Sequence, residues 1–129
     1  MAPLIETKRL ILKALSRGDA SLMYSYRSDP EVTRYQSWHP ASEHEAESFI
    51  IETNKTDFNT VDTWFQLGVY LKSTGELIGD IGIHFLAPDN RQAEIGFTIA
   101  PKHQRKGYAT EAVAQVFRLN QNLPIEFVV

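Results

Sequence analysis

The sequence contains no cysteine and no long run of apolar residues. The first absence excludes disulfide bonds, thiolate nucleophiles and cysteine metal sites. A membrane helix needs about 20 consecutive apolar residues, and a secretion signal needs an apolar core near the N-terminus, so we expect a cytoplasmic protein without a membrane partner. The net charge of −3 and the pI of about 5.8 argue against a nucleic-acid partner, because nucleic-acid-binding domains are usually basic.

The chain of 129 residues, 43% of them hydrophobic, is long enough for a substantial buried core. No linker, internal repeat or low-complexity segment divides it. The histidines show no spacing with nearby acids that is typical of metal ligands. We therefore predict one domain over residues 1–129, with no metal.

The first half of the chain predicts one strand, at residues 10–12, followed by two or three helices. Ser16 and Asp19 stand three residues apart, which is typical of a helix start. This helix should end just before Pro30, because proline disfavours helical geometry in the residue that precedes it; Pro30 can itself begin a short helix. A serine–glutamate capping box then predicts a helix over residues 43–55.

The second half of the chain is dominated by strands. Apolar residues alternate with others along residues 64–71, 77–85 and 93–99, which is the period of a half-buried strand. Short connections between these strands predict an antiparallel meander. Apolar residues after Gly107 recur at helical spacing, and residues 123–129 are typical of the beginning of another strand. The whole order predicts an α+β fold with a mixed, mainly antiparallel central sheet and flanking helices.

The segment 94–112 carries the clearest chemical signal. It predicts a strand, a basic turn and a helix that is entered through Gly107. Four of the five residues at 102–106 can carry positive charge, and the unpaired amides of a helix start, together with the turn before it, can bind an anion such as phosphate. The alternative is an ordinary strand-to-helix turn with a solvated basic surface, and spacing alone does not decide between them. Neither a Walker P-loop nor a dinucleotide fingerprint is present.

The run Gln104–Arg105–Lys106–Gly107–Tyr108–Ala109 resembles the Q/R-x-x-G-x-G/A signature of the GNAT superfamily of acetyl-coenzyme A-dependent N-acetyltransferases. Residues 93–104 are similar to that family's fourth strand and pyrophosphate loop. Residues 6–12, followed by Asp19 and Ala20, resemble the branch that acetylates ribosomal-protein N-termini. The resemblance extends over about residues 4–118.

This resemblance implies a GNAT-like fold and acetyl-CoA as the acetyl donor. It implies an amine, or more narrowly a protein N-terminal amine, as the acceptor. It also implies that ten residues bind the coenzyme, through backbone amides at the pyrophosphate loop and through backbone groups of the strand along the pantetheine arm. These residues are Phe97, Thr98, Ile99, Gln104, Arg105, Lys106, Gly107, Tyr108, Ala109 and Thr110.

Transfer of an acetyl group requires the amine to lose a proton, which a carboxylate or an imidazole can accept. Glu94 is the first candidate, because relatives often carry a glutamate on this strand near the acetyl group. His84 is the second, since His84 or Asp80 could approach Glu94 across the predicted hairpin. Each candidate also has a purely structural interpretation, as an exposed carboxylate or an accommodated strand histidine. Trp38 could wall a substrate groove or simply pack in the core.

The chain also departs from the family's pattern. Members usually continue past the coenzyme helix with a full fifth strand, another helix and two more strands. They also carry an asparagine that contacts the pantetheine arm and a tyrosine that protonates the departing thiolate, and no residue here matches these two. We therefore expect a C-terminally truncated fold that lacks the final helix and strands.

Such a chain could be a fragment of a longer enzyme, a natural truncation completed by another chain, or a non-catalytic relative. An unpaired sheet edge favours association, so we expect a homo-oligomer. Two functions stay open: N-acetyl transfer, and a non-catalytic acetyl-CoA-binding or interaction module.

Overall fold

A computed structural model gives the fold and describes residues 4–34, 38–55, 63–85, 92–118 and 126–128. The strands are β1 (Ile5–Glu6), β2 (Leu10–Lys13), β3 (Thr63–Leu71), β4 (Leu77–Phe85), β5 (Gln92–Ile99) and β6 (Glu126–Val128). The helices are α1 (Ala20–Arg27), α2 (Pro30–Thr33), α3 (Glu43–Thr53) and α4 (Tyr108–Phe117), with short 3-10 turns η1 (Arg17–Asp19) and η2 (Pro101–His103). Within these ranges, no helix is long and apolar enough to cross a membrane.

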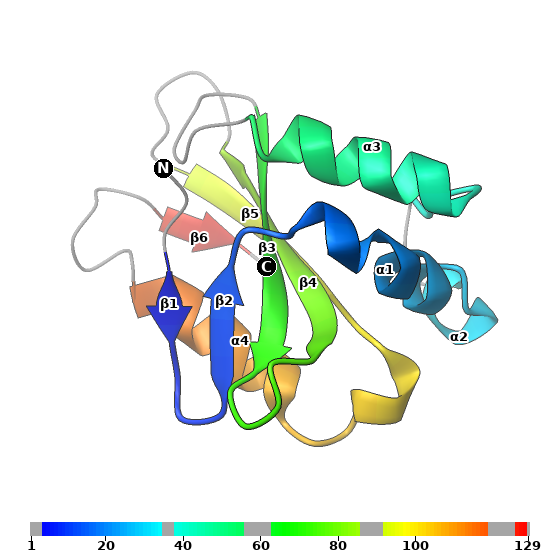
Figure 1. Cartoon of the computed structure of the whole chain (residues 1–129). Coiled ribbons are helices and arrows are strands. Elements are labelled where there is room, and N and C mark those ends of the chain that lie inside the picture. Colours follow the sequence, from blue (N-terminus) through cyan, green and yellow to red (C-terminus); the bar gives the residue numbers. More distant parts are fainter. Residues whose placement is uncertain (1–3, 35–37, 56–62, 86–91, 119–125, 129) are drawn as a thin grey trace.

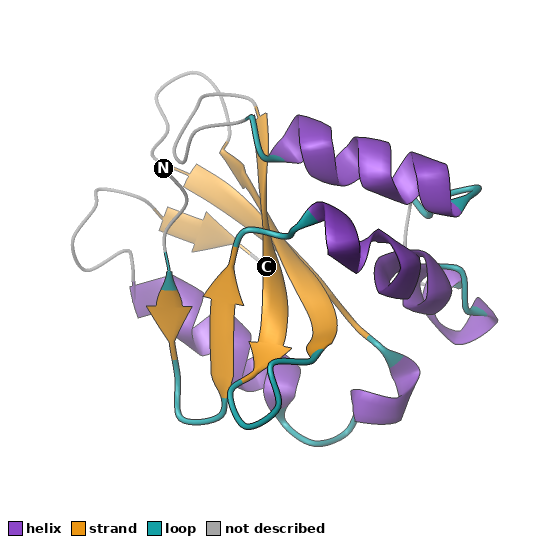
Figure 2. Cartoon of the chain, in the orientation of Figure 1, coloured by secondary structure: helices purple, strands orange, loops and turns teal. Residues whose placement is uncertain are grey.

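Within the described residues, the sheet has six strands in the order β1-β2-β3-β4-β5-β6, so each strand pairs with its neighbours in the sequence (Figure 2). The first five strands are antiparallel. In the described residues, β6 runs parallel to β5 and pairs only with the first three residues of β5, Gln92 to Glu94. This arrangement confirms the predicted α+β fold and the antiparallel meander. The predicted turn at residues 87–90 lies outside the described residues.

Helices cover both faces of the sheet (Figure 1). Helices α1 and α3 lie side by side on one face, and α4 lies on the other. The apolar residues divide accordingly: one buried cluster joins the sheet to Ala112 and Val116 of α4, and a second joins it to Met23 of α1 and Ile50 of α3. Strand alternation explains this division, because successive side chains of a strand point to opposite faces.

The predicted helix boundaries are correct to within a few residues. Helix α1 ends at Arg27, and α2 begins at Pro30 with a cap from Asp29, whose carboxylate accepts a hydrogen bond from the Glu31 amide at 2.9 Å. The residues Ser16 and Asp19 form their capping box around η1, one turn ahead of α1.

The predicted capping box of α3 is wrong in one detail. The Ser42 hydroxyl accepts from the Glu45 amide at 3.1 Å, as expected. The Glu45 carboxylate, however, accepts from the amide of Ala41 at 3.2 Å rather than from that of Ser42. The side chain reaches one residue further back, and the helix begins at Glu43 all the same.

Candidate active site

The turn between β5 and α4 has an unusual backbone. Arg105 and Gly107 both have left-handed angles, with φ of 64° and 82°. Such angles cost a residue with a Cβ atom about 1–2 kcal/mol, so the surrounding contacts must stabilise Arg105 in this conformation. The turn brings the first amides of α4 to the end of β5, and amides at a helix start are open to an anionic ligand.

Two residues that sequence reasoning missed clamp this turn to the N-terminal hairpin. The Glu111 carboxylate on α4 accepts from the Arg9 Nε at 2.7 Å, from the Arg9 amide at 2.9 Å and from the Thr7 hydroxyl. The Arg9 Nη1 also donates to the Lys106 carbonyl oxygen at 3.0 Å, and its guanidinium lies 4.4 Å from the centre of the Tyr108 ring. We call this arrangement the Arg9–Glu111 clamp.

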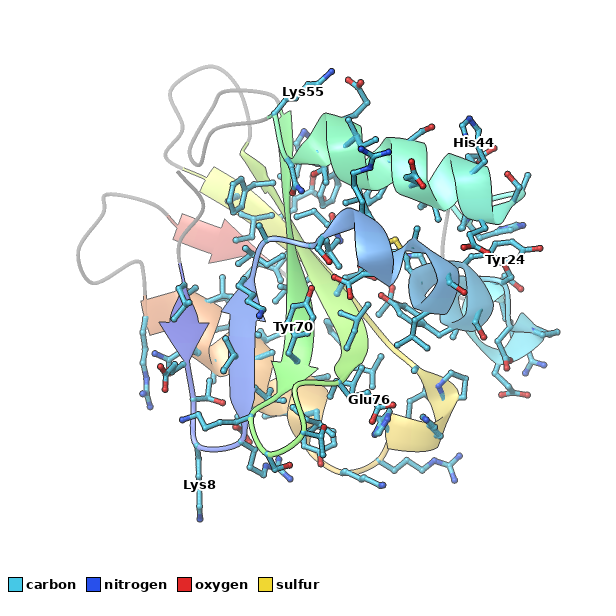
Figure 3. All side chains as sticks on the ribbon, viewed as in Figure 1. Lys8, Tyr24, His44, Lys55, Tyr70 and Glu76 are labelled. Carbon is cyan, nitrogen blue, oxygen red and sulfur yellow. The ribbon has the colours of Figure 1, made fainter. Side chains whose placement is uncertain are left out.

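The clamp affects the charge state of Glu111. Burial alone would raise the pKa of Glu111, but the hydrogen bonds from Thr7 and Arg9 outweigh it and hold the pKa below its ordinary value. Glu111 therefore stays ionised and keeps its bonds to the hairpin. Lys8, the neighbour of Arg9, points away from the molecule at the β1–β2 turn (Figure 3).

A cavity of about 400 Å³ opens beside this turn, and we call it the loop cavity. It brings together nine of the ten residues expected to bind a coenzyme; Lys106 does not line it. Glu31 and Val32 of α2 also line it, and the sequence did not single them out. The lining is Glu31, Val32, Phe97, Thr98, Ile99, His103, Gln104, Arg105, Gly107, Tyr108, Ala109 and Thr110.

The outer edge of β5 borders the loop cavity. In the described part of the chain, strand pairing with β6 stops at Glu94, so the second half of β5 has no neighbouring strand on that side. Backbone groups of a strand alternate between its two edges. The Ala100 amide bonds to β4, through Ile78, whereas the Ile99 carbonyl oxygen points to the outer edge and accepts from the Gln104 side chain at 2.9 Å. The backbone groups of Phe97 lie on the same edge as those of Ile99.

The second candidate region lies where β4 and β5 pair, on the face of the sheet opposite to α4. His84 and Glu94 are register partners, and His84 Nδ1 lies 3.0 Å from Glu94 Oε1. The imidazole also stacks on Trp64, with ring centres 4.7 Å apart and planes 17° apart. The predicted approach of His84 to Glu94 is confirmed, and their catalytic role stays a prediction.

Asp80 does not approach Glu94, so His84 is the one of the two residues that meets the expectation. Its carboxylate is fully buried and accepts from Arg27 Nε at 3.1 Å, from Gln66 Nε2 at 2.6 Å and from the Tyr26 hydroxyl. Burial, reinforced by the neighbouring carboxylate, raises the pKa of Tyr26 well above its ordinary value. Asp80 therefore fixes α1 to the sheet.

A smaller cavity of about 270 Å³ adjoins the same face of the sheet, and we call it the aromatic pocket. Trp38 stacks on Phe49, with ring centres 4.7 Å apart, so this tryptophan both packs and walls a groove. Two residues, Phe97 and Thr98, line both cavities. The lining is Arg27, Trp38, Phe49, Trp64, Gln66, Gly82, Gly96, Phe97 and Thr98.

Thr98 is the most informative residue at this junction. Its side chain is 3% exposed, and its hydroxyl has no hydrogen-bond partner within the described residues. A buried hydroxyl without a partner is costly, which suggests that a ligand supplies one. No group of three or more His, Asp or Glu side chains that could hold a metal ion occurs in the residues the structure describes.

Comparison with known proteins gives a consistent result. A model of the acetyltransferase (GNAT) domain matches residues 9–129. The uncharacterised N-acetyltransferase YoaA of Bacillus subtilis (strain 168) is 37% identical over 116 residues, which are 90% of this chain and 65% of the relative. The chain therefore spans just under two thirds of the length of that relative.

Two solved structures share the fold. One, from Vibrio cholerae, is provisionally described as a ribosomal-protein-serine acetyltransferase; it is 25% identical, with a TM-score of 0.78 over 95% of this chain and 70% of the other. The second is the microcin C7 self-immunity acetyltransferase MccE, solved in complex with acetyl-CoA and AMP. It is 17% identical, with a TM-score of 0.75 over 94% of this chain and 68% of the other.

Proposed function

Since the chain belongs to the GNAT acetyltransferase family, we propose that it transfers an acetyl group from acetyl-CoA to an amine. One observation carries the proposal. The loop cavity, at the start of α4, and the aromatic pocket, beside the His84–Glu94 pair, meet at Phe97 and Thr98. A donor in the first cavity and an acceptor in the second would have their reacting atoms at that junction.

The residues around the loop cavity fit an acyl-coenzyme A. Amides of residues 107–110 at the start of α4, with the Arg105 guanidinium nearby, suit a pyrophosphate. The outer edge of β5 beyond Glu94, where no described strand pairs, suits the amide groups of a pantetheine arm, which would bind as an added strand does. When bound, acetyl-CoA supplies an activated acetyl thioester.

His84 and Glu94 are proposed to accept the proton that the amine loses, directly or through a water molecule. The amine nitrogen then forms a bond to the acetyl carbon as the bond from that carbon to sulfur breaks. An amide on β5 near the junction would stabilise the negative charge that develops on the carbonyl oxygen. The thiolate that departs takes up a proton from solvent or from a residue outside the described ones.

A protein N-terminal amine is the narrower acceptor that we propose. The resemblance of residues 6–12 to the branch that acetylates ribosomal proteins supports it, and so does the likeness to the Vibrio cholerae structure. Short peptides with a free N-terminal amine are the natural first substrates for an assay.

Isothermal titration of the chain with acetyl-CoA tests the binding step, and absence of binding at millimolar concentration would overturn the proposal. Release of free thiol over a panel of amines then separates an enzyme from a non-catalytic binder. In an active enzyme, Glu94→Gln should slow release by roughly 100-fold and leave acetyl-CoA affinity unchanged. Binding without thiol release from any amine would favour the binding-module alternative.

A further inference from the structure

We infer that the aromatic pocket receives one ring-sized apolar group attached to the acceptor amine. The acceptors would then be primary amines with a hydrophobic substituent, whether free small amines or the first residue of a peptide. This inference rests on the proposed function, because it assigns a substrate class to the acceptor side of the same site.

The position of the aromatic pocket identifies it as the acceptor side. It shares Phe97 and Thr98 with the loop cavity, and Trp64 in its wall stacks on His84, which contacts Glu94. The buried Thr98 hydroxyl has no partner among the described residues, and Thr98 lines both cavities. An amine at this junction could donate a hydrogen bond to that hydroxyl.

The walls of the aromatic pocket favour an apolar group. Trp38, Phe49 and Trp64 line it, and the paired glycines Gly82 and Gly96 form part of its surface without a side chain of their own. Flat apolar groups pack well against aromatic rings. The volume of about 270 Å³ lies below the range of roughly 300–1,000 Å³ typical of drug-sized ligands, so it suits one substituent rather than a whole molecule.

The charged residue in the wall does not favour a charged substituent. Arg27 is held by two hydrogen bonds to buried Asp80, and its guanidinium lies 5.5 Å from the centre of the Trp38 ring. Its charge is therefore already neutralised by a carboxylate that no ligand can displace without burying an unpaired charge. A substituent with its own charge would be desolvated in the pocket without a counter-ion.

Intrinsic fluorescence offers a direct readout, because the chain has two tryptophans and both line this pocket. The chain would be titrated with phenethylamine, phenylalaninamide and a peptide that begins with phenylalanine. Glycinamide, aspartic acid diamide and a peptide that begins with aspartate serve as controls. We expect the apolar amines alone to change the emission, and Trp38→Phe and Trp64→Phe each to reduce the change. The free amines and the peptides distinguish the two sources of the ligand.

Gly96→Leu tests the location. A Cβ atom added at Gly96 meets nothing within 4 Å, and a strand accepts leucine, so the variant should fold while its side chain fills the pocket. We expect the affinity for the apolar amines to fall about tenfold or more, with a smaller fall for Gly96→Ala. Circular dichroism and acetyl-CoA titration of both variants should match the parent.

Two outcomes would overturn the inference: no difference in fluorescence response between apolar and control amines, or unchanged amine affinity in a folded Gly96→Leu variant. Failure of the proposed function looks different. In that case the titration shows no binding of acetyl-CoA. The fluorescence response to apolar amines can still be seen, because it is measured without the coenzyme.

Discussion

Two left-handed residues, Arg105 and Gly107, shape the entrance to α4, and they differ in what a substitution would cost. At Gly107 a new side chain meets both an unfavourable φ and the Arg9 guanidinium, 3.4 Å from the added Cβ. It would also stand at the wall of the loop cavity. Gly107 is therefore the residue at which the cavity can be changed most directly.

Gly107→Asp should weaken acetyl-CoA binding by roughly tenfold or more, because a carboxylate beside a pyrophosphate adds repulsion of like charges. Isothermal titration measures the change. Gly75→Asp is a matched control: Gly75 also has a positive φ, of 76°, and its added Cβ meets nothing within 4 Å. Both variants place an aspartate at a positive φ and add the same charge, and only the first adjoins the cavity. Equal affinities in the two would contradict our placement of the coenzyme.

The buried carboxylate of Asp80 predicts a large effect on stability. Asp80→Asn leaves the Arg27 charge in a buried place without its counter-ion, which typically costs about 3–5 kcal/mol. Urea denaturation measures the free energy of unfolding. Asp29→Asn, at an N-cap where asparagine serves as well as aspartate, should change it little. A loss in Asp80→Asn no larger than in this control would show that Asp80 is not the anchor of α1.

At the scale of residues, the sequence predicted the parts of the site whose residues lie close together in the chain, and it missed contacts between distant residues. The signature around Gly107 and the strand before it identified nine residues of the loop cavity because these are local in sequence, whereas Glu31 and Val32 of α2 are distant and were missed. Glu94 and His84 could be paired from strand alternation and one hairpin. The Arg9–Glu111 clamp could not, since its two residues are 102 apart and no pattern in the sequence pairs them. Asp80 is buried because α1 packs over it, and the alternation of residues along a strand does not predict how a helix packs.

Among the elements, the Arg9–Glu111 clamp joins the first hairpin to the first turn of α4. The β1–β2 turn carries no ligand-binding residue by itself, but through the Lys106 carbonyl it holds the turn that forms the loop cavity. The strands and helices could be predicted from the period of their apolar residues, and most helix caps from the capping residues. The reach of Glu45 to Ala41 did not, because a carboxylate can choose between neighbouring amides that are equally available in sequence.

The clamp should make stability depend on pH. A carboxylate with a lowered folded-state pKa, as at Glu111, contributes its full stabilisation above its unfolded-state pKa of about 4.3. That stabilisation is lost as the pH falls through the folded-state value. Between about pH 6 and pH 3, the fall in unfolding free energy should be smaller in Glu111→Gln than in the parent. Urea denaturation over this range measures it.

Arg9→Ala should reduce the same pH dependence, since it removes the Nε hydrogen bond and the positive charge that help to lower the pKa of Glu111, although the backbone amide of residue 9 keeps its bond to the carboxylate. Lys8→Ala, at the exposed neighbour, should leave it unchanged. A parent-like slope in Glu111→Gln would mean that other carboxylates carry the pH dependence.

For the whole molecule, the predicted homo-oligomer stays a prediction. An apolar recess of about 260 Å³ beside β5 is lined in part by Phe97, Val113 and Phe117, and Phe97 and Phe117 are 40% and 38% exposed. Such surface next to a strand edge that no described strand pairs favours association with a second copy. Light scattering coupled to size-exclusion chromatography should therefore give a mass above that of one chain.

Phe117→Ser should shift this mass toward the monomer. Leu22→Ser is the matched control, because Leu22 on α1 is also 38% exposed but lies on the opposite face of the sheet. A monomer at every concentration in the parent chain would contradict the prediction.

The sheet order has a consequence for synthesis. Because the strands pair in the order in which the ribosome makes them, each new strand meets a partner that has already emerged. Chains emerge N-terminus first. Each strand from β2 to β5 can therefore pair at once with the strand that precedes it in the sequence. The sheet can therefore form strand by strand during synthesis, and β4 and β5, which line the aromatic pocket, can be paired before α4 has formed.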